Sequence, residues 1–228
     1  MRVVIGFDAA EKQAAAVAAK TLYEVSRLEA EFLVSDKLRS QGLLTRLEDT
    51  RQNRYDLTSN APCSTEFSAS RFLTPLLGTG YALFTDCDVV FYENPIRMLA
   101  EVEEGRAVYV VKHKHIPTDK WKMVGQAQTT YPRKNWSSVM LFNCDHPANQ
   151  RLSVRDVNER PGRDLHAFYW LHDDEIGDLH PRWNWLVGVE EKPSPVGIAH
   201  FTLGGPFNSG WSGSDYDHLW LEAAQTGK

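Results

Sequence analysis

The start of the chain constrains the fold more than any other feature. An apolar run, Arg2–Phe7, is followed by a segment, Ala10–Leu28, in which apolar residues recur at helical spacing, and then by a second apolar run, Glu31–Ser35. A strand, a helix and a strand in this order predict a β-α-β unit, whose two strands lie parallel in one sheet. We therefore expect an α/β protein with a Rossmann-like central sheet flanked by helices.

The rest of the chain continues the alternation of strands and helices. Further strands are predicted at Tyr81–Thr85, Ala107–Lys112 and Ser137–Asn143, and helices at Thr65–Leu77, from Pro147, at Asp164–Leu171 and at Ser214–Thr226. The polar segment 37–61 has no assignable pattern. Since no repeat, low-complexity tract or linker interrupts the sequence, residues 1–228 are predicted to form a single domain.

Composition excludes several classes of protein. Hydrophobic residues make up 42% and charged residues 24% of the 228, which is typical of a globular domain. The net charge of −5 and the lack of a basic stripe argue against nucleic-acid binding. Cys63, Cys87 and Cys144 are far apart and suggest reduced thiols. With neither an export signal nor a transmembrane segment in the sequence, we expect a cytoplasmic protein.

The chemically most informative segment is Asp86-Cys87-Asp88, which directly follows the apolar run Tyr81–Thr85. A continuous apolar run of this length is typical of a buried strand, and ligands bind α/β sheets at the carboxyl ends of their strands. Two carboxylates repel each other unless a cation lies between them, and carboxylate oxygens suit Mn²⁺ or Mg²⁺. The alternative interpretation is a solvated turn.

A second triplet, Asp215-Tyr216-Asp217, shows that the pattern by itself is not specific. It stands at the start of the predicted last helix, where carboxylates interact favourably with the helix dipole. The position of each triplet relative to its strand or helix therefore distinguishes a metal site from a helix start.

Six segments, taken in order, carry a resemblance to a known family: Ile5–Asp8, Phe67–Phe72, Phe84–Val89, Trp136–Asn143, His172–Ile176 and His200–Phe207. In this order they resemble glycosyltransferase family 8 and its relatives, which have the GT-A fold; the resemblance implies a single GT-A-type domain with a mixed central sheet. The resemblance extends over nearly the whole chain. It implies a hexosyltransferase that moves a sugar from a UDP-sugar donor to a saccharide or other hydroxyl acceptor, with retention of configuration. It also implies a nucleotide-binding half, 1–90, and an acceptor-side half, 91–228.

The same resemblance assigns roles to individual residues. It implies that Asp86, Asp88 and His200 bind Mn²⁺ or Mg²⁺, and that Asp173 and Asp174 lie near the reacting carbon. Contacts with the donor are implied for Phe7, Asp8, Arg71, Asp86, Cys87, Ser137, Gly204 and Gly205.

Two positions depart from the family pattern. The lysine that usually precedes the closing Pro-Trp is absent, since Gly205 and Phe207 flank Pro206; the amide groups of the glycines could partly replace its contacts with the diphosphate. The glutamine of the acidic segment is replaced by Asp174.

Other interpretations remain open from the residues alone. His200 stands in an apolar run and could be a buried core histidine, and Arg71 could be a surface charge. His113-Lys114-His115 is interpreted as a solvated loop near an acceptor, because the lysine would repel a cation. Phe84–Val90 also resembles the nucleophile strand of haloacid-dehalogenase-type phosphatases, with Asp173 and Asp174 as the second acidic pair. A non-catalytic nucleotide-sugar or carbohydrate-binding module is the third alternative.

Overall fold

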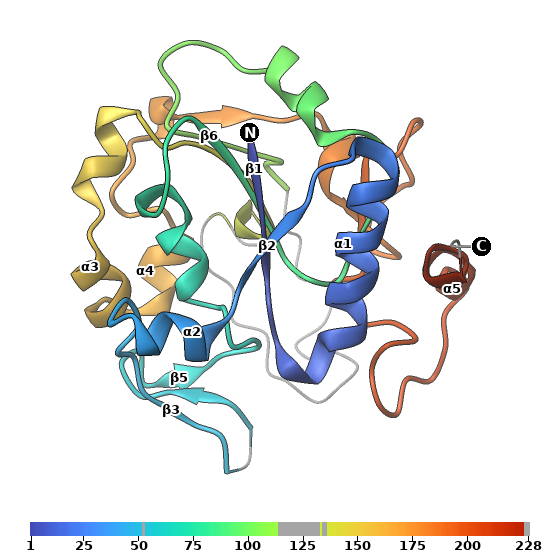
Figure 1. Cartoon of the computed structure of the whole chain (residues 1–228), viewed down its shortest axis with the longest axis horizontal. Helices are drawn as coiled ribbons and strands as arrows, with labels where there is room; N and C mark the ends of the chain where they lie inside the picture. Colours follow the sequence, from blue (N-terminus) through green and yellow to red (C-terminus); the bar gives the residue numbers. More distant parts are fainter. Residues whose placement is uncertain (52, 114–132, 134–135, 226–228) are drawn as a thin grey trace.

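The computed structural model of the chain describes residues 1–51, 53–113, 133 and 136–225 (Figure 1). Its strands are β1 (Arg2–Gly6), β2 (Ala30–Leu33), β3 (Glu48–Asp49), β4 (Tyr55–Asp56), β5 (Ala61–Pro62), β6 (Tyr81–Thr85), β7 (Val89–Phe91), β8 (Val108–Val110), β9 (Val139–Asn143), β10 (Ile176–Asp178), β11 (Trp185–Leu186) and β12 (Ile198–His200). Its α-helices are α1 (Lys12–Ser26), α2 (Ser35–Ser40), α3 (Val154–Glu159), α4 (Gly162–His166) and α5 (Asp217–Gln225). Short 3-10 helices are η1 (Ala9–Glu11), η2 (Ser70–Leu76), η3 (Pro95–Ala100), η4 (Trp136–Ser138), η5 (Pro147–Arg151), η6 (Asp173–Glu175) and η7 (Pro181–Asn184).

The central sheet has six strands in the order β10-β8-β9-β6-β1-β2. β1 is parallel to both β2 and β6, as the predicted β-α-β unit requires. β9 runs antiparallel to β6 and β8, and β10 is parallel to β8. The predicted mixed α/β sheet is therefore confirmed. Small separate sheets, β11-β12-β7 and β3-β4-β5, lie beside it.

β6 lies in the interior of this sheet and is buried, as its apolar sequence predicts. Ala82, Leu83 and Phe84 are fully buried. Figure 1 shows α1 on one side of β1 and β2, and α2, α3 and α4 on the other. One hydrophobic cluster contains residues from Val3 to Ile198, so both halves of the chain contribute to the same core.

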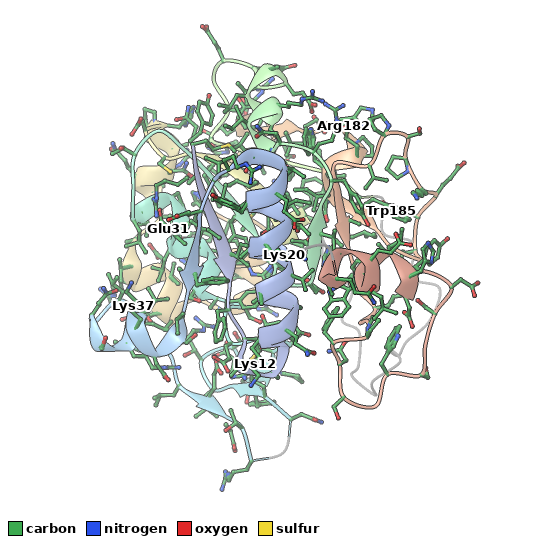
Figure 2. The ribbon with its side chains drawn as sticks, turned by 45° about the vertical axis from the view of Figure 1, so that its right-hand side comes forward. Lys12, Lys20, Glu31, Lys37, Arg182 and Trp185 are labelled. Atoms are coloured by element: carbon green, nitrogen blue, oxygen red, sulfur yellow. The ribbon has the colours of Figure 1, made fainter. Side chains whose placement is uncertain are left out.

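α1 is amphipathic, and its buried side, which includes Ala14, Ala18 and Leu22, contacts the sheet and β7. The helix ends at Arg27, whose φ of 62° is left-handed. Lys20 lies on the side of α1 next to α5 and donates hydrogen bonds to carbonyl groups in the last turn of that helix (Figure 2). A cation there interacts favourably with the dipole of α5.

The structure corrects some sequence-based assignments. The helix predicted at Thr65–Leu77 is the shorter 3-10 helix η2, with Pro75 inside it. The segment 37–61 contains most of α2 and the small sheet β3-β4-β5, which the buried ion pair between Arg46 and Asp56, at 2.5 Å, supports. No helix in the described part of the chain has both the length and the apolar character that a bilayer span requires.

We expect truncation of β6 to destabilise the whole domain. Leu83→Ala removes a fully buried side chain and should lower the free energy of unfolding by about 2–5 kcal/mol. Leu57, which is 53% exposed, provides the control, because Leu57→Ala should change it by less than about 0.5 kcal/mol. Urea unfolding followed by circular dichroism measures both variants, and equal effects would contradict the central position of β6.

Candidate functional site

The two aspartates of the predicted metal motif lie at the carboxyl end of β6. Asp86 directly follows this strand, and Asp88 directly precedes β7. β12 pairs antiparallel with β7, so that His200 is opposite Val89 and next to Asp88. The backbone N–H of Phe201 donates a hydrogen bond of 2.9 Å to the carbonyl of Asp88. Strand pairing thus brings a histidine from late in the chain to the acidic motif.

Asp86, Asp88 and His200 form one group in the structure. A ligand atom from each lies within 4.8 Å of the others, and His200 Nε2 is 3.3 Å from Asp88 Oδ1. Both carboxylates are partly exposed, whereas the imidazole is buried. Two carboxylates and one imidazole are an acceptable donor set for Mn²⁺ or Mg²⁺, with open positions left for a second ligand. The group therefore fits the predicted divalent cation.

A buried amide orients the imidazole. Asn184 donates a 2.9 Å hydrogen bond from Nδ2 to Ser138 Oγ, which identifies Oδ1 as the atom that accepts from His200 Nδ1, 3.1 Å away. The lone pair of His200 Nε2 then faces the aspartates. Metal-binding histidines ordinarily have such a partner on the second ring nitrogen. This arrangement favours a ligand role for His200 over the interpretation as a core histidine.

Arg71 is buried beneath Asp86. Its Nη1 donates hydrogen bonds to Asp86 Oδ1 at 2.7 Å and to the carbonyl of Ser137 at 2.9 Å. The guanidinium also lies over the rings of Phe67 and Phe84, at 5.1 and 5.3 Å. Arg71 is therefore not a surface charge. In this structure its described contacts hold the carboxylate and the start of β9 instead of reaching toward a donor phosphate.

Ser137 is tied to a buried histidine. Its Oγ is 2.6 Å from His166 Nδ1. Burial, and then the charges of Arg71 and Arg46, lower the pKa of His166 to about 3, so the ring is neutral at neutral pH. The hydroxyl group of Ser137, which is predicted to contact the donor, is thus held in place next to Asp86.

Glu11 approaches the motif from η1. Cys87 Sγ donates to Glu11 Oε2 at 3.1 Å, and Asn208 Nδ2 is 3.4 Å from Oε1. Burial, and next the charge of Asp88, raise the pKa of Glu11 to about 7. Burial also raises the pKa of the Cys87 thiol. The side chain of Cys87 points into the protein, and only its backbone is left for the predicted donor contact.

The remaining predicted donor contacts divide into two groups. Phe7 and Asp8 follow β1 at the same sheet edge, where Phe7 packs on Phe32 and Asp8 accepts hydrogen bonds from backbone N–H groups, including that of Ala10. Asp8 is buried and stabilises the start of η1.

Gly204 and Gly205 form a turn beside β12. Gly204 has a φ of 103°, which favours glycine, and its N–H donates to the carbonyl of Phe201. The N–H of Gly205 donates to Asn208 Oδ1. Both amides are used within the turn, so the expectation that they replace the missing lysine has no support in this structure.

The structure does not bring Asp173 and Asp174 to this site. They precede β10, and Ile176 at the start of that strand lies level with Ala82 near the start of β6, whereas Asp86 follows the end of β6. From strand geometry, the separation is roughly 13 Å along the strands and about 14 Å across them. The reason is the parallel pairing of β10 with β8. It places this acidic run at the amino ends of these strands, whereas the metal group lies at the carboxyl end of β6.

Both residues have other partners there. The side chain of Asp173, 93% exposed, forms an ion pair with Arg133, and the carbonyl of Asp174 accepts from Arg106. Their predicted position near the reacting carbon is therefore not supported.

Several residues of the site were missed by sequence reasoning. His166, Asn184 and Glu11 act through partners distant in the chain, and no motif marks them. Ser138 lies within the segment Trp136–Asn143, but nothing in that segment indicates its bond with Asn184. Asn184 had one signal, since a lone amide between Trp183 and Trp185 in a buried run needs a hydrogen-bond partner.

Comparison with solved structures defines the class of fold. The chain is similar to galactosyltransferase LgtC in complex with donor and acceptor sugar analogues (TM-score 0.58, 12% identity, 98% of this chain and 95% of that one). It is also similar to glycosyltransferase GlyE of Streptococcus pneumoniae TIGR4, with a TM-score of 0.57 and 16% identity. This match covers 99% of this chain but only 60% of GlyE. Mouse xyloside xylosyltransferase 1 matches with a TM-score of 0.53 and 10% identity, over 87% of this chain and 96% of that one. The fold is that of the GT-A glycosyltransferases similar to family 8.

Sequence comparison identifies the family. No family model matches the chain. Protein CDI of Arabidopsis thaliana is 38% identical over 229 residues, which cover 96% of this chain and 84% of that protein. The chain belongs to the same family as Protein CDI.

We expect Asn184 to determine how tightly a divalent cation binds. Asn184→Ala removes the partner of His200 Nδ1 and should weaken Mn²⁺ binding about 10- to 100-fold, as measured by isothermal titration calorimetry. Asn149 is an equally buried, hydrogen-bonded amide outside the metal group. Asn149→Ala should destabilise the protein but leave the Mn²⁺ affinity of the folded state unchanged. Unchanged affinity in Asn184→Ala would contradict the orienting role.

The buried His166 should make stability depend on pH. Its folded pKa is lowered to about 3, so between this value and the unfolded pKa of about 6.5 the unfolded state binds more protons. Stability is therefore lost as the pH falls through this window. Between pH 7 and pH 5 the wild type should lose about 2 kcal/mol more free energy of unfolding than His166→Gln, which cannot titrate. Parallel pH profiles from urea unfolding would contradict a neutral buried ring.

Proposed function

We propose that this protein is a metal-dependent glycosyltransferase that moves a sugar from a UDP-sugar donor to a saccharide or other hydroxyl acceptor. The observation that carries the proposal is the group formed by Asp86, Asp88 and His200 at the carboxyl end of β6. The GT-A fold supports it, because such folds need a sugar donor and an acceptor, and the solved LgtC complex contains analogues of both.

The metal group suits a diphosphate leaving group. A divalent cation held by Asp86, Asp88 and His200 would supply Lewis-acid stabilisation of the charge that develops on the diphosphate. Arg71 holds Asp86 in place from below, and Asn184 holds His200. Folding therefore positions the metal ligands before a donor binds, so the site is preorganised.

The arrangement along the sheet edge supports the two halves proposed from the sequence. Phe7 and Asp8 follow β1 on one side of the metal group, and Ser137 precedes β9 on the other. We propose that the nucleoside lies toward β1 and the transferred sugar toward β9, with the diphosphate between them. Retention of configuration is proposed from the resemblance to family 8.

Two alternatives are less well supported. A haloacid-dehalogenase-type phosphatase would use Asp173 and Asp174 beside Asp86, and these lie at the other edge of the sheet. A non-catalytic nucleotide-sugar-binding module is consistent with the same fold. The missing lysine and the internal use of the Gly204 and Gly205 amides, which leave the diphosphate with fewer contacts, are consistent with such a module.

The proposal predicts that a UDP-sugar binds only together with a divalent cation. In a thermal-shift screen, a UDP-sugar with Mn²⁺ should raise the melting temperature, since ligands that bind the folded state stabilise it. Asp86→Asn and Asp88→Asn should abolish the shift and any donor hydrolysis. The anomeric configuration of the product, determined by NMR, tests retention.

The second acidic triplet provides a matched control. Asp215 is exposed next to α5, outside the metal group. Asp215→Asn should therefore behave like the wild type. Absence of any Mn²⁺-dependent binding in the wild type contradicts the proposed function, and binding without hydrolysis or transfer across a broad set of acceptors indicates a binding module.

A further inference from the structure

His113 is a buried histidine that neither the family resemblance nor the metal group accounts for. It follows β8, and its side chain is 2% exposed, so it is not the solvated loop residue that the sequence predicted. Nδ1 is 2.8 Å from Glu190 Oε1. Nε2 is buried and has no hydrogen-bond partner among the described residues. An unpaired buried ring nitrogen is costly and is unusual without a functional reason.

His113 lies at the same edge of the sheet as the metal group. Val110 pairs with Met140, and Val139 pairs with Thr85, so the end of β8 is level with the end of β6. With β9 between them, β8 is about 10 Å from β6.

The order of the strands determines which part of a donor could reach His113. Along this edge the order is Phe7 and Asp8 after β1, the metal group after β6, Ser137 before β9, and last His113 after β8. A diphosphate at the metal group extends to a nucleoside in one direction and to a sugar in the other. His113 is on the side away from β1, where the sugar is proposed to lie.

The ring is held in one orientation. The carbonyl of His113 accepts a hydrogen bond from Trp136 Nε1 at 3.2 Å. The backbone of Glu190 is fixed by Trp185 Nε1, which donates to its carbonyl at 3.1 Å, and by its own N–H, which donates to Leu186. A carboxylate accepts only, so Nδ1 is the protonated nitrogen.

Burial lowers the pKa of His113, which keeps the ring neutral at neutral pH. With the proton on Nδ1, Nε2 is a hydrogen-bond acceptor. A diphosphate has no proton to donate at this pH, and His113 is outside the three-residue metal group. A hydroxyl group is the partner that matches a neutral acceptor.

We propose that His113 Nε2 accepts a hydrogen bond from a hydroxyl group of the sugar carried by the donor, and that Glu190 is a positioning residue that selects the tautomer. This inference rests on the proposed function and identifies a residue that contacts the transferred sugar. A site built to bind a hydroxyl rejects a sugar that lacks it, because the buried nitrogen is then left unpaired. His113 would therefore contribute to donor specificity.

The test compares the binding of UDP with that of a UDP-sugar. Calorimetric titrations at pH 7.5 with saturating Mn²⁺ use UDP and whichever of UDP-glucose, UDP-galactose and UDP-N-acetylglucosamine binds the wild type most tightly. His113→Phe should leave the affinity for UDP within about twofold and weaken the UDP-sugar about 3- to 10-fold, the range for one lost hydrogen bond. His113→Gln, whose amide oxygen can occupy the place of Nε2, should restore part of the loss.

Two further variants sharpen the comparison. Glu190→Ala removes the acceptor that keeps the proton on His113 Nδ1, and it should weaken binding of the UDP-sugar but not of UDP. This variant also tests the proposal if His113→Phe fails to fold. His218 is exposed on α5, so His218→Gln is the matched control and should change neither affinity. Monodeoxy analogues of the sugar identify the hydroxyl, because the relevant analogue should bind wild type and His113→Phe equally.

Each outcome has a distinct meaning. Selective loss of UDP-sugar affinity supports the inference. Equal losses of affinity for UDP and the UDP-sugar overturn it, and so does the absence of any loss. An unchanged affinity for the UDP-sugar with slower transfer also overturns it, because that result assigns the hydroxyl group to the acceptor. If wild type binds neither ligand, the proposed function itself fails, and the two failures are therefore distinguishable.

Discussion

The balance of charge at the end of β6 is the constraint on which the site depends. Asp86 and Asp88 are separated by a single residue and repel each other. Arg71 on η2 forms an ion pair with the first, and the imidazole of His200 on β12 lies beside the second. These contacts orient the two carboxylates and leave both partly exposed. A cation-binding group is thereby formed by the fold before any ligand arrives.

Buried polar side chains keep this group in place. His200, Asn184 and Ser138 form one chain of hydrogen bonds, and Ser137 and His166 form another. In the low dielectric of the interior such bonds are strong, and an unpaired member is costly. These bonds connect β12 with η7 and η4, and η4 with α4, at the edge that carries the site.

The side chains along this sheet edge also distinguish between the alternative functions. It carries a metal group, a buried serine and a histidine–glutamate pair, while the acidic run at Asp173 and Asp174 lies at the other edge. This distribution fits transfer of a group attached to a diphosphate and leaves a phosphatase without its second acidic pair.

Local patterns in the sequence determined much of the architecture. The β-α-β start, the buried strand Tyr81–Thr85 and the aspartates after it were predictable, because apolar periodicity reports which residues face the core. The helical interpretation of Thr65–Leu77 was only approximate, since Pro75 has no N–H to donate and the segment forms a shorter 3-10 helix. The polar segment 37–61 gave no periodic signal, because its fold depends on the buried pair of Arg46 with Asp56.

Only the tertiary structure decided which distant side chains meet. That His200 lies beside Asp88 follows from the pairing of β12 with β7, and that Asp173 lies far away follows from the parallel pairing of β10 with β8. The roles of Asn184 and His113 depend on contacts of the same long-range kind. A sequence specifies the period of each segment, but the pairing and direction of strands arise from packing between segments. For this reason the two aspartates could be predicted from the local pattern, His200 only through the family resemblance, and Asn184 and His166 not at all.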